Sequence, residues 1–215
     1  MSRNAFAVCL TLTCAVAGIA CATPQTVLER PAAASRALPT VVTLKHDDGS
    51  MDGKRSIAGS GHAVLFDRPD GEWDVTRVQV YGSRYGHPQP PDEDFNVTIA
   101  DADMNVLAQV GAPYSRFARG QSAWVSVDVP AQSVPEQFYV CVTFDPEQTK
   151  GVYVGYDESV AQSHSKRALP GSHIGEVQGE FDWMIRASVT QHGAASTGAE
   201  WRVYIVRCKR PWLIS

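Results

Sequence analysis

Short apolar runs separated by turn-forming residues recur along the middle of the chain. In the run WDVTRVQVYG, residues 73–82, side chains alternate with a period of two, which is typical of a strand with one buried face. One set of positions holds Val75, Arg77, Gln79 and Tyr81, and the other holds Thr76, Val78 and Val80. Similar runs recur at a spacing of roughly 8–12 residues, with Gly, Pro, Asp and Asn between them. The pattern predicts an all-β fold, an antiparallel jelly-roll-type sandwich that forms a single domain.

Aromatic residues in these runs receive their own predictions. Trp124 and Trp183 lie within strong strand patterns, which favours a place in the core, whereas Trp73 follows a turn and is expected to be exposed. Tyr153 and Tyr156 are three positions apart in one run, so they point to opposite faces and one of them should be buried. No segment shows the periodicity of an amphipathic helix, and no sequence repeat is present.

The composition fits one globular domain with extensions. The chain has 215 residues, a formal net charge of -4 and 44% hydrophobic residues. Nucleic-acid binding requires a basic face that attracts phosphate groups, and a slightly acidic chain offers no such electrostatic signal. We therefore expect no nucleic-acid partner.

The first 21 residues have the features of an export signal. Arg3 precedes an uncharged apolar run, residues 5–20, which is short for a transmembrane helix. Two cleavage sites compete: AGIAC resembles a lipobox ending at Cys21, which would be lipidated, and ACA resembles an ordinary signal-peptidase site before Thr23. The Pro/Ala/Ser-rich segment 22–39 suits a tether, which favours the lipoprotein. We expect the chain in the cell envelope, anchored to the membrane by lipid if Cys21 is modified, or secreted.

Residues 40–190 are predicted to form the sandwich, and residues 191–215 a small-residue linker and a strand-like tail. The apolar tail would be prone to aggregation if uncovered, so we expect it to dock on the domain or on a partner. After signal removal, Cys141 and Cys208 are the pair available for a disulfide in an oxidising compartment. Alternatively, Cys141 is simply a buried apolar residue of its strand.

Two stretches of the predicted domain resemble known modules. GSGHAVLFDRPDGEWDVTRVQVYGSRYG, residues 59–86, looks like the opening strands of galactose-binding-like jelly-roll modules. GEFDWMIRASV, residues 179–189, is similar to the closing strand of such modules and of the domain that follows subtilisin-type proteases. The combination is also similar to bacterial exported domains without an established role. The resemblance implies a sandwich and favours binding, and it carries no catalytic residue over to this chain.

The segment YGSRYGHPQPPDED, residues 81–94, is the candidate ligand site. Loops on a rigid sandwich commonly carry binding residues. Aromatic rings can stack on a sugar, while a guanidinium group and carboxylates can bond its hydroxyls. The candidate residues are Tyr81, Arg84, Tyr85, His87, Asp92 and Asp94, of which Arg84, Tyr85 and His87 are expected just past the strand. The alternative is that these residues only pack and turn one end of the sandwich.

A structural calcium ion is the one cofactor that the sequence indicates. The loop KHDDGSMDG, residues 45–53, contains Asp47, Asp48 and Asp52, and calcium takes about six to eight oxygen ligands. The loop lacks the spacing of an EF-hand, and aspartates equally suit solvated turns. Zinc is disfavoured because the histidines are scattered and neither an HExxH nor a CxxC motif occurs.

Together these features favour a non-catalytic module at the bacterial cell envelope that binds a carbohydrate or a protein, and they disfavour an enzyme. An exported hydrolase, a glycosidase or peptidase using the loop 84–94, is the alternative, because carboxylates and histidine can act as acid and base. Ser60 and His62 share a strand face but lack an evident orienting carboxylate. A structural envelope lipoprotein is the third possibility.

Overall fold

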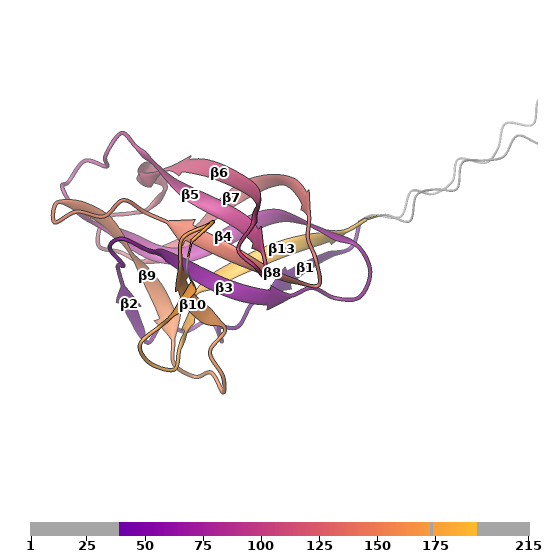
Figure 1. Cartoon of the computed structure of the whole chain (residues 1–215). Helices are drawn as coiled ribbons and strands as arrows, with labels where there is room; N and C mark the ends of the chain where they lie inside the picture. The colour runs from indigo at the N-terminus through magenta and orange to yellow at the C-terminus, as the bar shows by residue number, and fades with distance from the viewer. Residues whose placement is uncertain (1–38, 173, 193–215) are drawn as a thin grey trace, which may run out of the picture. The chain divides into compact units, whose positions relative to one another are not determined.

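The computed structural model describes residues 39–172 and 174–192, which form two antiparallel β-sheets (Figure 1). The strands of the seven-stranded sheet are β1 (Val41–Leu44), β13 (Ile185–Gln191), β4 (Trp73–Gly86), β9 (Lys150–Asp157) and β12 (Asp182–Trp183), with β2 (Gly53–Arg55) paired to β9 and β7 (Ala123–Ser133) paired to β4. The six-stranded sheet consists, in spatial order, of β11 (Ile174–Glu176), β10 (Ser165–Ala168), β3 (Gly61–Asp67), β8 (Gln137–Thr143), β5 (Asp94–Asp101) and β6 (Val106–Pro113). A short 3-10 helix, η1 (Tyr114–Arg116), follows β6.

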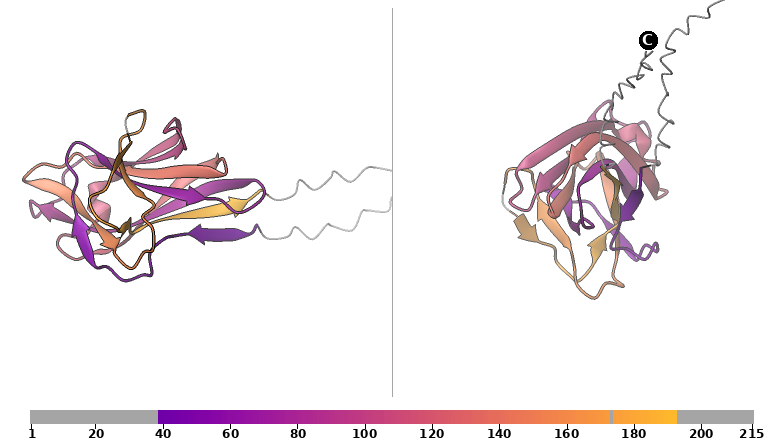
Figure 2. Two further views of the ribbon diagram at one scale, coloured as in Figure 1. Left: turned by 60° about the horizontal axis from the view of Figure 1, so that its bottom comes forward. Right: turned by 90° about the vertical axis from the view of Figure 1, so that its right-hand side faces the viewer.

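The two sheets form the two layers of a sandwich (Figure 2). Between β3 and β10 the chain passes from one sheet to the other at every connection except that from β5 to β6, which are neighbours in one sheet. This alternation confirms the prediction of an all-β, jelly-roll-type sandwich. In the described residues, no helix is long and apolar enough to span a membrane.

The core lies between the inner faces of the sheets. It is built mainly from β-branched and aromatic side chains, which fit a pleated surface, and burying each of them contributes about 1.5–3 kcal/mol. Trp183 belongs to this core, as predicted. Trp73 is also buried, contrary to the prediction, because its ring packs in the core while its Nε1 donates to the carbonyl of Asp70. Trp124 is in neither core cluster, so its predicted role as a core anchor was wrong.

Strand β4 differs from its predicted pattern in two ways. A bulge lies at Thr76, where the pairing with β7 and with β13 shifts register, and it turns Val75 to the buried face that holds Val78 and Val80. The strand also continues to Gly86, beyond the predicted end. Its last five residues pair with β9, so Arg84 and Tyr85 belong to the strand and not to the following loop.

Several predictions fall on residues that the structure does not describe. These are the signal and lipid attachment at Cys21, the tether, the C-terminal tail and Cys208, which all lie outside the described ranges. Cys141 is buried in β8, its thiol donates to the carbonyl of Ala168 at 3.2 Å, and burial raises the pKa of that thiol to about 12. A thiol with so high a pKa is a poor nucleophile at neutral pH.

Candidate functional site

Four aromatic side chains gather on the outer face of the seven-stranded sheet. Tyr81 and Tyr85 come from β4, Trp124 from β7 and Tyr153 from β9. Tyr81 is paired with Trp124, and Ser83 with Tyr153, so alternation along β4 puts all four rings on one face. None of the four belongs to either core cluster. Because outward positions of a sandwich are usually polar, core packing does not explain these rings.

Tyr85 and Tyr153 form an open pair of rings, which we call the aromatic platform. Their ring centroids are 4.6 Å apart and the planes are tilted by 37°. Tyr153 is 36% exposed, which makes it one of the few large exposed apolar side chains in the described part of the chain. A Cβ atom at Gly151 would lie 2.3 Å from the hydroxyl of Tyr85, so the ring of Tyr85 fits against β9 only because residue 151 is glycine.

Polar groups surround the platform. The ammonium group of Lys54 lies 5.5 Å from the centroid of the Tyr153 ring and donates to the hydroxyl of Ser83 at 3.1 Å. The hydroxyl of Ser56 lies 3.4 Å from that of Tyr85. Exposed rings beside donors and acceptors are suited to a ligand that presents both C–H groups and hydroxyls.

The second pair of outer-face rings is covered. Tyr81 and Trp124 have centroids 5.2 Å apart, and the guanidinium group of Arg186 lies 4.0 Å from the Trp124 centroid. Arg186 is held there by Asp47, whose Oδ2 accepts from Nε at 3.0 Å. This hydrogen bond raises the pKa of Arg186, although partial burial opposes the shift. The ion pair therefore covers Trp124, whereas the ammonium group over Tyr153 is farther away, at 5.5 Å, and that ring is 36% exposed.

The candidate ligand residues of the segment 81–94 are distributed over three places. Tyr81 and Tyr85 are on the outer face, as described above. Arg84 points to the opposite face, is 8% exposed, and donates from Nη1 to the carbonyl of His87 at 2.7 Å and from Nη2 to that of Pro88. Its guanidinium group thus fixes the loop that follows β4. The side chain of His87 is exposed in that loop.

Asp92 and Asp94 lie together in an open groove of about 470 Å³. The other residues of the groove are Pro90, Pro91, Glu93, Pro113 and Ser115. Glu93 accepts from the ammonium group of Lys150 at 2.7 Å, so one of the three acidic residues of the groove is already paired. Neither the tyrosines nor Arg84 line this groove, so the structure does not bring the six candidate residues to a single surface.

The three aspartates proposed for calcium have separate partners. Asp47 binds Arg186, Asp48 Oδ1 accepts from the backbone N–H of Ser50 at 2.7 Å, and Asp52 Oδ2 accepts from that of Glu158 at 2.8 Å. Among the described residues, their carboxylates do not form a group with ligand atoms within 4.8 Å of one another. A structural calcium ion remains a prediction.

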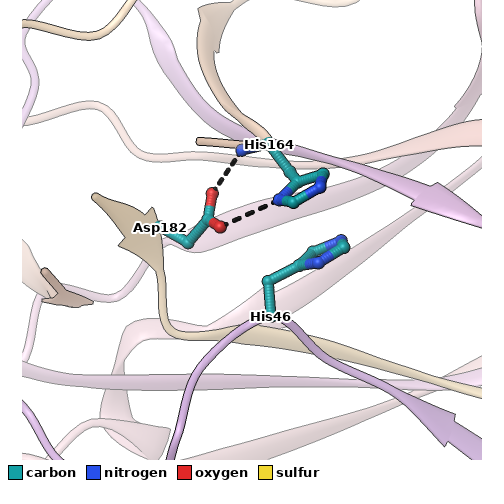
Figure 3. A group of neighbouring side chains, drawn as sticks. All are labelled: His46, His164 and Asp182. Atoms are coloured by element: carbon teal, nitrogen blue, oxygen red, sulfur yellow. Dashed lines mark hydrogen bonds and ion pairs between the residues drawn. The ribbon is translucent and has the colours of Figure 1, made fainter. Parts of the chain in front are cut away.

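One cluster of potential metal ligands does occur in the described ranges, and we call it the histidine stack: His46, His164 and Asp182 (Figure 3). The imidazole rings have centroids 3.7 Å apart and are within 6° of parallel. His46 Nε2 lies 2.9 Å from the carbonyl oxygen of Leu65, and His164 Nδ1 lies 3.1 Å from Asp182 Oδ2. Because these oxygens only accept, both nitrogens carry protons.

The carboxylate of Asp182 is fully buried and also accepts from the backbone N–H of His164 at 2.7 Å and from the hydroxyl of Ser165 at 2.8 Å. Burial lowers the pKa of His46, and the neighbouring His164 lowers it further, while the Leu65 carbonyl, Asp182 and Asp67 oppose the shift. The cluster thus favours neutral His46.

The histidine stack is built for hydrogen bonding more than for coordination. The lone pair of an imidazole nitrogen lies in the ring plane, so two parallel stacked rings cannot both direct lone pairs at one ion. A carboxylate that orients an imidazole is also a feature of general bases, and the side chain of His164 is 35% exposed although one face of its ring stacks on His46. The hydrogen bonds of the stack give it a structural role, because they tie separate chain segments together.

Comparisons with known proteins give only distant similarities. No protein-family model matches the chain, and no curated protein matches its sequence. One similar solved structure is the clostridial cysteine protease Cwp84 after propeptide cleavage, with TM-score 0.49 and 14% identity, covering 71% of this chain and 40% of that one. Another contains the cysteine protease and lectin-like domains of Cwp84, a surface layer associated protein of Clostridium difficile, with TM-score 0.40, 12% identity, and coverage of 71% and 36%. The present chain spans less than half the length of either, and similarity of this degree supports no conclusion about function.

Sequence analysis did not identify Lys54 or His46 as site residues. Lys54 lies in β2, which has three residues and is too short to show a period of two. His46 lies in a loop, and its approach to His164 depends on contacts between residues 118 positions apart. Tyr153 was recognised as one of two tyrosines with opposite orientations, and the structure shows that it is the exposed one, while Tyr156 packs against the core.

Proposed function

We propose that this chain is an exported, non-catalytic binding module that holds a sugar ring on the aromatic platform. The observation that carries the proposal is the pair Tyr85–Tyr153, with the ammonium group of Lys54 over the Tyr153 ring and the hydroxyl of Ser56 beside that of Tyr85. The apolar face of a sugar can stack on such rings, and its hydroxyls can bond to the adjacent donors and acceptors.

Location at the cell envelope rests on the sequence alone. The export signal, the lipobox-like AGIAC and the Pro/Ala/Ser-rich tether would place the sandwich at a membrane surface, where polysaccharides are common ligands. A protein ligand is the other partner class predicted from the sequence, and it becomes the preferred one if no saccharide binds.

Calorimetric titration of the purified chain with neutral oligosaccharides tests the proposal. Replacing Tyr85 or Tyr153 by alanine is expected to weaken binding by about tenfold, since each change removes one stacking surface. Val106→Ala is the matched control, because Val106 is an exposed apolar residue (50%) of the other sheet, and it should leave affinity unchanged.

Two results would overturn the proposal. If both tyrosine variants bind as the unmodified chain does, the platform is not the site. If the chain hydrolyses the saccharides, and His87→Ala or Asp92→Ala removes that turnover, the module is a hydrolase that uses the loop 84–94.

A further inference from the structure

A small cavity of about 270 Å³ lies where the edges of the two sheets meet, beside the aromatic platform. Residues of both sheets line it, and we call it the arginine pocket: Arg55, Ser56, Ile57, Ala58, Arg167, Val177, Gln178, Phe181 and Trp183. Arg55 ends β2 and Trp183 ends β12 in the seven-stranded sheet, whereas Arg167 comes from β10 of the six-stranded sheet. The pocket is therefore formed only when the sandwich is assembled.

Two arginines and no acidic residue line this pocket. Within the described ranges, neither Arg55 nor Arg167 forms an ion pair, whereas two other arginines and two lysines do. Three acidic residues are adjacent in sequence to lining residues without lining the pocket themselves: Glu176, which is paired with Lys166 at 2.6 Å, Asp182, which is paired with His164 at 3.1 Å, and the exposed Glu180. Two like charges that share a cavity repel each other, and an anionic ligand would remove that repulsion.

Arg55 is held in place before any ligand binds. Its Cζ atom lies 4.9 Å from the ring centroid of Tyr156 and 5.0 Å from that of Phe181. Nη1 donates to the carbonyl of Gln178 at 2.9 Å. Among the residues that the structure describes, the other N–H groups of this guanidinium fork have no hydrogen-bond partner. Because the fork is already oriented, little conformational entropy is lost when an oxyanion binds to it.

The arginine pocket and the aromatic platform meet at Ser56, which follows the edge strand β2. Ser56 lines the pocket, and its hydroxyl lies 3.4 Å from the hydroxyl of Tyr85 on the platform. Lys54 and Arg55 point to opposite faces of β2, since Lys54 contacts Tyr153 on the outer face and Arg55 is paired with the core residue Val154. A ligand that occupies both sites therefore passes round this edge of the sheet, next to Ser56.

We propose that the arginine pocket binds the acid group of a saccharide whose neighbouring sugar ring lies on the aromatic platform, so that the ligand is an acidic carbohydrate. This inference rests on the proposed function for the position of the sugar ring. Carboxylate and phosphate share the required chemistry, because both accept paired hydrogen bonds from a guanidinium fork.

The test compares matched probes on the whole chain by calorimetric titration. A galacturonic acid trimer carries carboxylates, a galactose trimer is its neutral counterpart, and galactose phosphate distinguishes phosphate from carboxylate. Acetate and inorganic phosphate probe the pocket without a sugar. The variants are Arg167→Gln, Arg55→Gln and Arg55→Lys, the last of which keeps the charge but loses the fork. Arg77→Gln makes the same change in net charge at an exposed site that is paired with Asp128.

The acidic trimer is expected to bind at least about tenfold more tightly than the neutral trimer, and its affinity should fall as salt increases. Arg167→Gln and Arg55→Gln should each weaken binding of the acidic trimer by about tenfold and leave binding of the neutral trimer unchanged. Arg77→Gln should change neither affinity. Melting temperatures close to that of the unmodified chain show that the variants are folded, and Arg167 is the safer position because it is exposed.

The outcomes separate this inference from the proposed function. Equal binding of acidic and neutral trimers, unaffected by the arginine variants, would overturn the arginine pocket while the platform stands. Binding of acetate or phosphate that is lost in Arg167→Gln, without binding of either trimer, would support an anion site and contradict the platform. If none of the five probes binds, both proposals are wrong. A preference for galactose phosphate over the acidic trimer would identify phosphate as the acid group.

Discussion

Two pairs of stacked rings on this domain differ in how they are held, although the side chain of His164 is 35% exposed and Tyr153 is 36% exposed. In the histidine stack the rings are nearly parallel at 3.7 Å, and each has a nitrogen bonded to an oxygen of another segment. In the aromatic platform the rings of Tyr85 and Tyr153 are tilted by 37° and meet through the pairing of β4 with β9. Ring contacts alone therefore do not indicate whether a pair is part of the framework or available to a ligand.

The difference follows from the chain segments that each pair joins. His46 and His164 lie in loops and Asp182 lies in the short strand β12. These three segments are not paired with one another as strands, so their side-chain hydrogen bonds supply links that strand pairing does not. The platform residues come from β4 and β9, which are already paired along five residues, so these rings add little to the fold. We expect mutations at the stack to act on stability and mutations at the platform to act on binding.

Replacing Asp182 by alanine should give the largest effect on stability. The change removes a fully buried carboxylate that accepts hydrogen bonds from His164 and Ser165, and leaves those donors without an acceptor. We expect the free energy of unfolding to fall by about 3–5 kcal/mol, measured by urea denaturation at pH 7.

Asp128→Ala provides the comparison for Asp182→Ala. Asp128 also pairs with a basic residue, Arg77, but its side chain is 78% exposed, so its removal should cost no more than about 1 kcal/mol. Equal losses in the two variants would contradict the structural role of the histidine stack.

The fold could be predicted from the sequence because it depends on a local signal. Alternation of apolar and polar residues gave the strands and the sandwich, since each strand must bury one face. The same signal failed at Thr76, where a bulge shifts the alternation by one residue, and at Trp73, where ring burial and a hydrogen bond to the preceding turn outweigh the position after a turn.

The candidate sites depend on contacts between distant segments, which no local pattern reveals. Tyr85 was identified, but its partner Tyr153 is 68 residues away and becomes a neighbour only through the pairing of β4 with β9. Arg55 and Arg167 reach one cavity from two sheets, and nothing in their sequence context indicates this. Polar residues can be assigned to a face from sequence once the strand pairing is known, and not before.

His62 differs from the histidines of the stack, because its ring is buried and its two nitrogens lack good hydrogen-bond partners in the part of the chain that the structure describes. The ring is packed edge-to-face against Trp183 at 4.6 Å, and neither nitrogen has a hydrogen-bond partner of good geometry among the described residues. Burial lowers the pKa of His62 to about 4, with the carbonyls of Arg55 and Val142 opposing the shift only in part. Below about pH 6.5 the unfolded chain therefore binds more protons than the folded one, and stability falls with pH down to about pH 4.

His62→Leu should remove most of this acid sensitivity. For the unmodified chain, the His62 contribution amounts to a loss of about 2 kcal/mol between pH 7 and pH 5, measured by urea denaturation at both values. Between pH 7 and pH 5, the free energy of unfolding of the variant should fall by about 2 kcal/mol less than that of the unmodified chain. The lowered pKa of His46 will still make the stability of the variant fall with pH to some extent. His87→Leu, at an exposed position, serves as the control. An unchanged difference between pH 7 and pH 5 in His62→Leu would show that His62 is not the group responsible.

Replacing Lys54 by methionine should have the smallest effect on stability. It tests whether residues of the platform contribute less to stability than residues of the histidine stack do. The change removes one hydrogen bond to Ser83 and one cation–π contact with Tyr153, while Ser83 keeps its hydrogen bond with Ser122. We expect the free energy of unfolding to change by less than about 1 kcal/mol, as for the exposed control Lys45→Met, whereas saccharide affinity falls several-fold only in the first variant. A loss of stability as large as that of Asp182→Ala would mean that the platform, like the histidine stack, is part of the framework, and the argument for a ligand on this face would then fail.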